Sequence, residues 1–229
     1  MRVAALYDIH GNAPALEAVL AELDRLGADL VIVGGDIAAG PLPRETLAAL
    51  RALGDRARFV RGNADRDLRE WAAEQLTAEE REFLAGLPET VSLDIDGLGR
   101  VLFCHGSPRS DEEIITPASP DERVAPMLAA VSEPVVVCGH THMQFDRTVG
   151  EKRLVNAGSV GMPYADRAGA YWALLGPGVE LRRTDYDLAL AAVRIRASGA
   201  PDAEEFAAEN VLTVPTAGEA IRVFEPGPA

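Results

Sequence analysis

The sequence has no uninterrupted run of about 18 apolar residues, so we expect no membrane-spanning helix. It has only two cysteines, Cys104 and Cys138, and both lie inside apolar, strand-like segments. Buried, reduced thiols are therefore expected rather than a disulfide. The first residues lack the basic-then-apolar pattern of a secretory signal, because Arg2 leads directly into a strand-like segment. These absences predict a cytoplasmic protein that does not cross a membrane.

The chain also lacks a basic excess, with 22 Lys and Arg against 36 Asp and Glu and a formal net charge of −14. Such a charge disfavours non-specific binding to nucleic acid or to an anionic membrane. It also opposes an anionic substrate, unless bound divalent cations make the binding pocket locally positive. The remaining composition, 48% hydrophobic and 25% charged, is that of an ordinary globular protein.

The first part of the chain alternates buried strands with amphipathic helices. Strands at 3–7, 30–33 and 58–60, separated by helices at 14–26 and 43–53, give a βαβαβ rhythm. This rhythm is typical of a parallel sheet with a site at the carboxyl ends of its strands. Further along we expect helices on both sides of Thr77 and at 121–131, 188–196 and 202–209, and strands at 90–95, 101–104, 135–138, 144–149, 153–155, 170–175, 179–184 and 221–224.

No linker or internal repeat interrupts this order. We therefore expect one domain over residues 1–229, with residues 185–229 packed on it as a helical appendage. A polar, proline-containing stretch at 110–120 has no clear period and is expected to form a surface loop near the site.

Side chains that commonly bind metals follow several of the expected strands. Asp8 and His10 come at the end of the first strand, and the two-residue period of a strand predicts that they point the same way. The chain has only four histidines, and each lies in a glycine-containing turn after an apolar run. Any one of these motifs could be a plain turn or a structural histidine. Together they predict a metal site at five strand ends, formed by Asp8, His10, Asp36, Asn63, His105, His140 and His142.

The order Asp-x-His, Gly-Asp, Gly-Asn, a lone His and Gly-His-x-His resembles the pattern of the calcineurin-like metallophosphoesterase superfamily. The resemblance runs from Asp8 to about Tyr171 and is greatest to the small bacterial and archaeal branch described as phosphodiesterases. The loop at 156–161 and the Asp185-Tyr186-Asp187 stretch are similar to that branch as well. The resemblance implies an α/β fold, a four-layer αββα sandwich of two mixed sheets flanked by helices.

Carried over residue by residue, the resemblance implies two divalent cations. It places Asp8, His10 and His142 on one cation and Asn63, His105 and His140 on the other, with Asp36 bridging. Mixed oxygen and nitrogen ligands suit Mn, Fe, Zn or Ni, of which Mn is favoured. The implied reaction is hydrolysis of a P–O bond by a metal-bridging hydroxide, with Asp36, Asn63 and His105 as catalytic residues.

One position departs from the family pattern. Many members have His after Gly-Asn, where it binds phosphate and protonates the leaving group, whereas this chain has Ala64. General acid catalysis is worth about 10²–10⁴-fold, so its loss affects poor leaving groups most. A phosphodiester or an activated ester therefore fits better than an alkyl monoester. Asp65 keeps the acidic residue that orients that His in the family, and we expect it to be an exposed turn residue.

Arg61 and Arg109 are candidates to bind the substrate phosphate, although an arginine in such a position is more often a solvated surface residue. Ser159, Trp71, Trp172 and Cys138 are interpreted as packing residues. The sequence thus predicts a binuclear phosphoesterase, with a phosphodiesterase preferred, acting on a small phosphate ester. The alternatives are a phosphomonoesterase or dinucleoside-polyphosphate hydrolase and, in another class, a metal-binding scaffold for a protein partner, as the Ala64 departure allows. Small members of the superfamily often form dimers, so the resemblance also implies a possible homodimer.

Overall fold

The computed structural model describes residues 1–225. Its strands are β1 (Val3–Leu6), β2 (Leu30–Val33), β3 (Ala57–Phe59), β4 (Thr90–Ile95), β5 (Gly99–Cys104), β6 (Val135–Cys138), β7 (Phe145–Val149), β8 (Lys152–Asn156), β9 (Ala170–Leu175) and β10 (Val179–Thr184). Its helices are α1 (Ala13–Leu26), α2 (Pro43–Arg51), α3 (Asn63–Arg66), α4 (Glu70–Gln75), α5 (Ala78–Ala85), α6 (Asp121–Leu128), α7 (Leu188–Arg196), α8 (Ala203–Ala207) and α9 (Ala217–Phe224), with short η1 (Gly54–Arg56) and η2 (Ala208–Leu212). None of these helices is long and apolar enough to span a bilayer.

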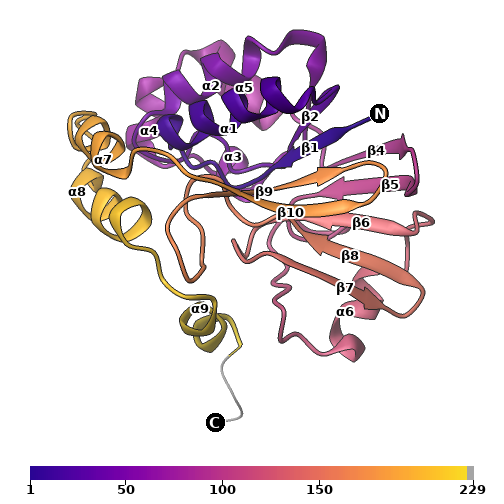
Figure 1. Ribbon diagram of the computed structural model, residues 1–229. Helices are drawn as coiled ribbons and strands as arrows, with labels where there is room; N and C mark the ends of the chain where they lie inside the picture. Colours follow the sequence, from indigo (N-terminus) through magenta and orange to yellow (C-terminus); the bar gives the residue numbers. More distant parts are fainter. Residues whose placement is uncertain (226–229) are drawn as a thin grey trace.

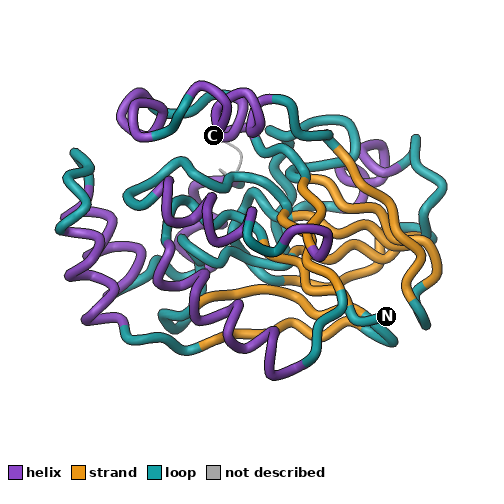
Figure 2. Tube along the Cα trace, turned by 90° about the horizontal axis from the view of Figure 1, so that it is seen from above, coloured by secondary structure: helices purple, strands orange, loops and turns teal. Residues whose placement is uncertain are grey.

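The strands form two five-stranded mixed sheets that lie face to face, with helices outside them (Figures 1 and 2). The first sheet has the order β10-β9-β1-β2-β3, in which β1, β2 and β3 are parallel and β9 is antiparallel to β1. The second has the order β4-β5-β6-β8-β7, with β5, β6 and β8 parallel and β4 and β7 antiparallel at its edges.

The alternation of side chains along each strand explains the layers. On β1, Ala4 and Leu6 pack against the core formed with α1, α2 and α5, whereas Val3 and Ala5 face the second sheet. On β5, Phe103 faces the first sheet, and Leu102 packs with α6 on the opposite side. Both faces of both sheets are thus covered, and the predicted four-layer αββα sandwich is confirmed.

The chain just after β1 is joined to β6 across the inner layer. The buried Tyr7 hydroxyl donates a hydrogen bond to the Val137 carbonyl at 3.0 Å. A tyrosine can sit in this apolar layer only because its hydroxyl finds such a partner. The contact fixes the carboxyl ends of the two strands relative to one another, directly beneath the turns that carry the metal-ligand candidates.

Several helix ends follow the sequence signals. The Asn12 side chain caps α1, which ends at Gly27 in the left-handed region, and Thr77 with Glu80 forms a capping box on α5. Most expected strands lie within one or two residues of their observed bounds. The edge strands and hairpins also follow the expected order.

The C-terminal part of the chain is helical, and one expectation there is wrong. Residues 221–224 were expected as a strand but belong to α9, which starts with a capping box between Thr216 and Glu219. The apolar residues at 221–224 are typical of a buried strand, but here they belong to a short, amphipathic and largely exposed helix, in which Val223 is 77% exposed. The segment from α7 to η2 packs against the first layer. Its Ile195, Phe206 and Val211 contact the cluster that contains Ala13 and Leu42. The last four residues of the expected appendage lie outside the described part.

Candidate metal centre

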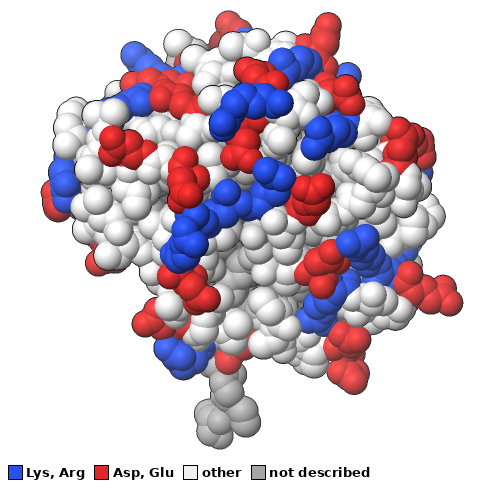
Figure 3. Space-filling view, in the orientation of Figure 1, with Lys and Arg blue, Asp and Glu red and all other residues white. Residues whose placement is uncertain are grey.

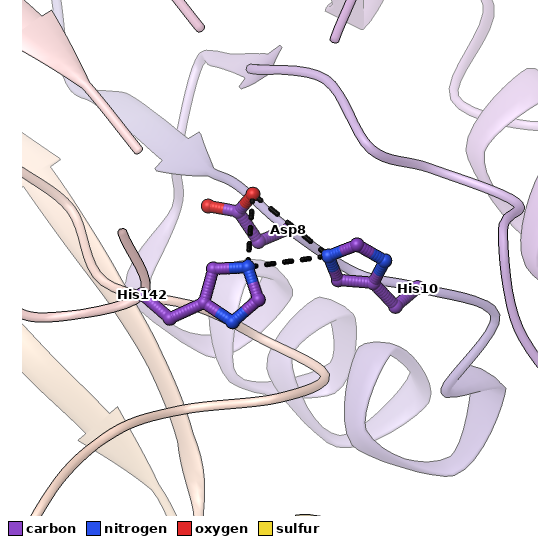
Figure 4. Close-up of side chains that lie close together, drawn as sticks. All are labelled: Asp8, His10 and His142. Carbon is purple, nitrogen blue, oxygen red and sulfur yellow. Dashed lines mark hydrogen bonds and ion pairs between the residues drawn. The ribbon is translucent and has the colours of Figure 1, made fainter. Parts of the chain in front are cut away.

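Two groups of potential metal ligands lie side by side at the carboxyl ends of the strands. Asp8, His10 and His142 form one, and Asp36, His105 and His140 form the other; within each group the donor atoms lie within 4.8 Å of one another. Figure 4 shows the first group, with its carboxylate and two imidazoles pointing toward a common centre. Asn63 lies beside the second, its Oδ1 3.1 Å from Nε2 of His105. The structure thus brings together all seven side chains singled out from the sequence.

The turns that hold these side chains have an unusual backbone. Asp8, His10, Asp36, His140 and His142 all have positive φ, between 47° and 65°. Among residues other than glycine, Asp, Asn and His tolerate this region best, although each still costs about 1–2 kcal/mol. The expectation that strand alternation aligns Asp8 with His10 is therefore wrong, because β1 ends at Leu6 and both residues lie in the turn beyond it. The turn, and not the strand, directs both side chains to one point.

Each aspartate is fixed by one oxygen and presents the other. Oδ2 of Asp8 accepts a hydrogen bond from the backbone N–H of His140 at 2.8 Å, and Oδ1 of Asp36 accepts one from Ala64 at 2.8 Å. The remaining oxygen of Asp8 is 3.4 Å from Nε2 of His142. The remaining oxygen of Asp36 is 3.6 Å from Nε2 of His10 and 3.5 Å from Nε2 of His105, so it stands between the two groups.

The donor set fits divalent cations. Asp8 is fully buried, and its Oδ1 has no hydrogen-bond partner among the described residues. A buried carboxylate oxygen without a partner is strongly destabilising. A cation bound by Asp8, His10 and His142 would supply what this oxygen lacks, and the Nε2 atoms of His10 and His142, 3.2 Å apart, converge on the same space.

Backbone carbonyls orient two of the imidazoles. Nδ1 of His105 is 2.9 Å from the carbonyl of Gly34, and Nδ1 of His142 is 2.6 Å from the carbonyl of Met162. A carbonyl only accepts, so each Nδ1 carries the proton and donates. This arrangement leaves the Nε2 lone pair of each ring free for a cation, as is usual for metal-binding histidines.

The electrostatics of the site follow from burying carboxylates and imidazoles together. Burial lowers the pKa of His10 to about 4, despite the neighbouring Asp36. Burial also acts on His105, but the adjacent Asp36 and Asp8 carboxylates outweigh it and raise the pKa of His105 to about 10. The pKa of Asp36 lies far below its usual range despite burial, because His105 and His10 lie beside it. The two carboxylates therefore create a strong local preference for positive charge.

Asp65 corrects the expectation of an exposed turn residue. It is 1% exposed, and its carboxylate accepts backbone hydrogen bonds from Asp36 and Gly62 through Oδ2, at 2.8 and 2.9 Å, and from Ile37 through Oδ1 at 2.8 Å. Burial and the nearby Asp36 raise the pKa of Asp65 to about 7. The side chain clamps the turn that carries Asp36 to the turn that carries Asn63. Its position three residues after Gly62, at the start of a short helix, was the signal that could have revealed this role.

Glycines leave room for the aspartates. A Cβ on Gly62 would lie 2.2 Å from Oδ1 of Asp36, and one on Gly139 would lie 2.5 Å from Oδ2 of Asp8. Any side chain at either position would displace a carboxylate. The Gly-Asn and Gly-His pairs of the sequence are thus explained by close packing around the site.

The residues interpreted as packing residues behave as such. The hydroxyl of Ser159 donates to the Asp8 carbonyl and accepts from the Met162 N–H, both at 2.7 Å. Trp172 and Cys138 are fully buried, and Cys104 and Cys138 are free thiols. Trp71 is half-buried and packs against the cluster of α7 and α8.

A cavity of about 490 Å³ opens onto the metal centre. His10, Asp36, Asn63 and His142 line its inner side, together with Ala64. Its outer side comes from residues that the sequence interpretation missed, Asp67, Arg69, Asp202, Glu205, Phe206 and Asn210. The sequence predicts a helix at 202–209, but nothing in the order of the chain indicates that this segment returns to the site.

Arg61 and Arg109 are not among the residues that line this cavity. Arg61 donates to Glu89 at 2.7 Å, and Arg109 donates to Glu113 at 2.9 and 3.0 Å. Each guanidinium is thus engaged by a carboxylate elsewhere on the surface.

Similar proteins share this architecture. An uncharacterised protein of Methanocaldococcus jannaschii is 25% identical over 87% of this chain and 94% of its own length. A crystal structure of a metallophosphoesterase from Sphaerobacter thermophilus is 29% identical, with a TM-score of 0.73 over 92% of this chain and all of that one. A hypothetical protein of Pyrococcus horikoshii, 24% identical, shares the fold with a TM-score of 0.78 over 90% of this chain and 97% of that one.

The family model for the calcineurin-like phosphoesterase superfamily domain matches residues 1–175, which contain all seven donor residues. Members of this family are metal-dependent hydrolases, in agreement with the two donor groups described above. The chain therefore belongs to the calcineurin-like phosphoesterase superfamily.

Proposed function

We propose that this chain is a binuclear metal-dependent phosphodiesterase. The observation that carries the proposal is the position of Asp36, whose Oδ2 is about equally distant from His10 in one donor group and His105 in the other, at 3.6 and 3.5 Å. One carboxylate oxygen between two sets of imidazoles is the arrangement expected of a bridging ligand.

In this proposal Asp8, His10 and His142 hold one cation and Asn63, His105 and His140 hold the other, with Asp36 shared. Imidazole, carboxylate and amide donors suit Mn, Fe, Zn or Ni, and Mn is favoured. When bound, two such cations supply positive charge for the phosphate oxygens and lower the pKa of coordinated water.

The protein's own residues set the substrate preference. Ala64 lines the cavity where the family places a histidine, so this position has no proton for a departing alkoxide. Asp67, Asp202 and Glu205 line the outer wall and repel a dianionic monoester more strongly than a monoanionic diester. The absence of a proton donor at position 64 and the carboxylates of the cavity wall both favour a phosphodiester, or an ester with a good leaving group.

The test compares matched esters on metal-loaded protein. Wild-type protein is supplied in turn with Mn, Fe, Zn, Ni and Mg, and kcat/KM is measured for bis(para-nitrophenyl) phosphate and para-nitrophenyl phosphate. We expect turnover with a transition metal and a higher kcat/KM for the diester. A clear preference for the monoester would instead indicate a phosphomonoesterase. No turnover of any ester by protein shown to contain metal would favour a scaffold role.

Asp36→Ala tests the bridge, with Asp55→Ala as a matched control because Asp55 is exposed in η1. We expect Asp36→Ala to reduce kcat/KM by more than about 100-fold, the upper end of what loss of a supporting residue costs. Metal content measured on the purified variant should fall for both cations together. Retention of two cations and wild-type turnover would contradict the bridging role.

A further inference from the structure

The cavity beside the metal centre has one basic residue in its lining. Among the described residues that line it, Arg69 is the only Lys or Arg, and three carboxylates, Asp67, Asp202 and Glu205, share the same wall. Arg69 also lines an adjoining cavity of about 380 Å³ with Trp71 and Pro201. Its side chain therefore stands where the space next to the metal ligands opens outward.

Other arginines of the neighbourhood are held elsewhere. Arg66 binds three carboxylates, those of Asp67, Asp111 and Glu112, at 2.9, 2.9 and 2.6 Å. Arg61 and Arg109, the two candidates suggested by the sequence, are each engaged by a glutamate away from the cavity. None of these three lines the cavity, so Arg69 is the arginine that a bound ester would meet.

Arg69 keeps donors available. Its side chain is 77% exposed and, among the described residues, makes one ion pair, from Nη1 to Oδ2 of Asp202 at 3.0 Å. A guanidinium has five N–H groups in a planar fork, so four remain after this bond. Such a fork matches two phosphate oxygens better than an ammonium does. Asp202 holds one edge of the guanidinium, and the other edge is free to bind an anion.

We propose that Arg69 is a substrate-binding residue that contacts the non-bridging phosphate oxygens of the ester, and that Asp202 positions it. The proposal rests on the proposed phosphoesterase function and deepens it. A guanidinium contributes hydrogen-bond donors in a planar fork, so Arg69 binds the phosphate and does not act as a general acid for the leaving group. Arg69 thus binds the phosphate, as the histidine at position 64 does in many family members. No described residue replaces that histidine as the proton donor for the leaving group.

The variants are Arg69→Ala and Arg69→Lys, with Arg56→Ala as the matched control. Arg56 is also exposed and also pairs with a single carboxylate, that of Asp24 at 3.2 Å, and does not line the cavity. KM and kcat are measured for bis(para-nitrophenyl) phosphate on protein loaded with the best metal. The inhibition constant of inorganic phosphate and the metal dissociation constants are measured in parallel.

We expect Arg69→Ala to raise both KM and the inhibition constant of phosphate by about 10–100-fold, the range for losing a charged hydrogen-bonded contact. Arg69→Lys should recover part of this loss, because it restores the charge without the planar fork. The metal dissociation constants and the Arg56→Ala values should stay at the wild-type level. Asp202→Asn should raise KM less than Arg69→Ala does, whereas Glu204→Gln, two residues further along in α8 but paired with Arg196, should not change it.

KM and phosphate inhibition within twofold of wild type in Arg69→Ala would overturn the proposal, as would an equal rise in Arg61→Ala or Arg109→Ala. If the wild-type protein turned over no ester, calorimetric titration of metal-loaded protein with inorganic phosphate would still test Arg69. Failure of Asp36→Ala to lose activity would overturn the two-metal proposal separately, because it leaves the Arg69 comparison unaffected.

Discussion

The main body of the chain and its C-terminal segment contribute to the site in different ways. All seven donor side chains come from residues 8–142, inside the part matched by the family model, and are mostly buried in turns fixed by backbone hydrogen bonds. Residues 202–210 lie beyond that part and contribute only to the outer wall of the cavity. Figure 1 shows α7 and α8 against the helices of the first layer, far along the chain from β1.

The two regions therefore control different properties of the site. The metal ligands are positioned by constrained turns, so small changes there should abolish chemistry. The wall includes exposed side chains held by ion pairs, such as Arg69 with Asp202, so changes there should alter which ester binds. On the face seen in Figure 3, acidic and basic side chains likewise lie next to one another and form no separate basic patch.

The C-terminal segment also approaches the metal centre from a second side. Phe224 of α9 packs on Tyr164, with ring centroids 6.0 Å apart, and Tyr164 stacks on His142 at 5.2 Å. Glu225 then joins α9 to the loop before α6, accepting hydrogen bonds from Thr116 at 3.0 Å and Ser119 at 2.6 Å. The contacts of α9 can therefore be removed by substitution without changing the donor residues themselves.

The largest effect should come from removing metal. Protein treated with a chelator and dialysed should lose its turnover and regain it on addition of Mn. It should also melt at a lower temperature, because a cation that binds only the folded state stabilises it by about 2.7 kcal/mol at 100 times its dissociation constant. Differential scanning fluorimetry with and without Mn measures this. An unchanged melting temperature would mean that the donor groups bind no cation.

Asp65→Ala should have the next largest effect. It leaves three backbone N–H groups near the metal centre without their acceptor, and we expect a loss of about 2–4 kcal/mol in the free energy of unfolding. Metal affinity should fall by about 10–100-fold, since Asp36 loses its support. Asp65→Asn should lie between, because its amide oxygen still accepts. Urea unfolding and metal titration measure both quantities, and wild-type metal affinity in Asp65→Ala would refute the clamp.

Tyr164→Ala removes the ring that stacks on His142 and should weaken metal binding by about 2–10-fold, the range for an aromatic pair. Tyr164→Phe keeps the ring and should bind metal like the wild type. Phe224→Ala, one contact further away, should have a smaller effect than Tyr164→Ala. Calorimetric titration with Mn gives the comparison, and equal losses in the Ala and Phe variants of Tyr164 would argue against stacking.

The smallest effect is expected from Glu225→Gln, which changes only the link of α9 to the body. Arg123, helped by Ser119 and Thr116, lowers the pKa of Glu225 below its ordinary value. The link therefore stabilises the fold above the pKa of an unfolded Glu, about 4.3, and is lost as the pH falls through the lower folded pKa. We expect a loss of about 1 kcal/mol or less at neutral pH that disappears in acid, with unchanged kcat. A loss of equal size at both pH values would show that charge plays no part.

Much of the fold could be predicted because the signals were local. The βαβαβ rhythm, the turn residues after each strand and the capping box of Thr77 with Glu80 are readable in short windows, and the seven donors were found by their order after the strands. The strand expected at 221–224 was wrong even though α9 starts with a local capping box, but the functional residues that escaped prediction depend on contacts distant in sequence. Asp65 looked like a turn residue because two of its three backbone hydrogen-bond donors, the N–H groups of Asp36 and Ile37, lie far away in the sequence. Arg69 could not be recognised because the wall it completes comes from residues 202–210.

The positive φ angles at the donor positions restrict which residues could ever replace the ligands. At positions 8, 10, 36, 140 and 142 the main chain admits Asp, Asn, His and Gly far more readily than Glu, Cys or any β-branched residue. Exchange of one ligand for another is therefore limited by steric demands before coordination chemistry is considered. Drift toward a thiolate-rich or glutamate-rich centre would require rebuilding these turns, whereas aspartate-to-asparagine changes would leave the backbone as it is.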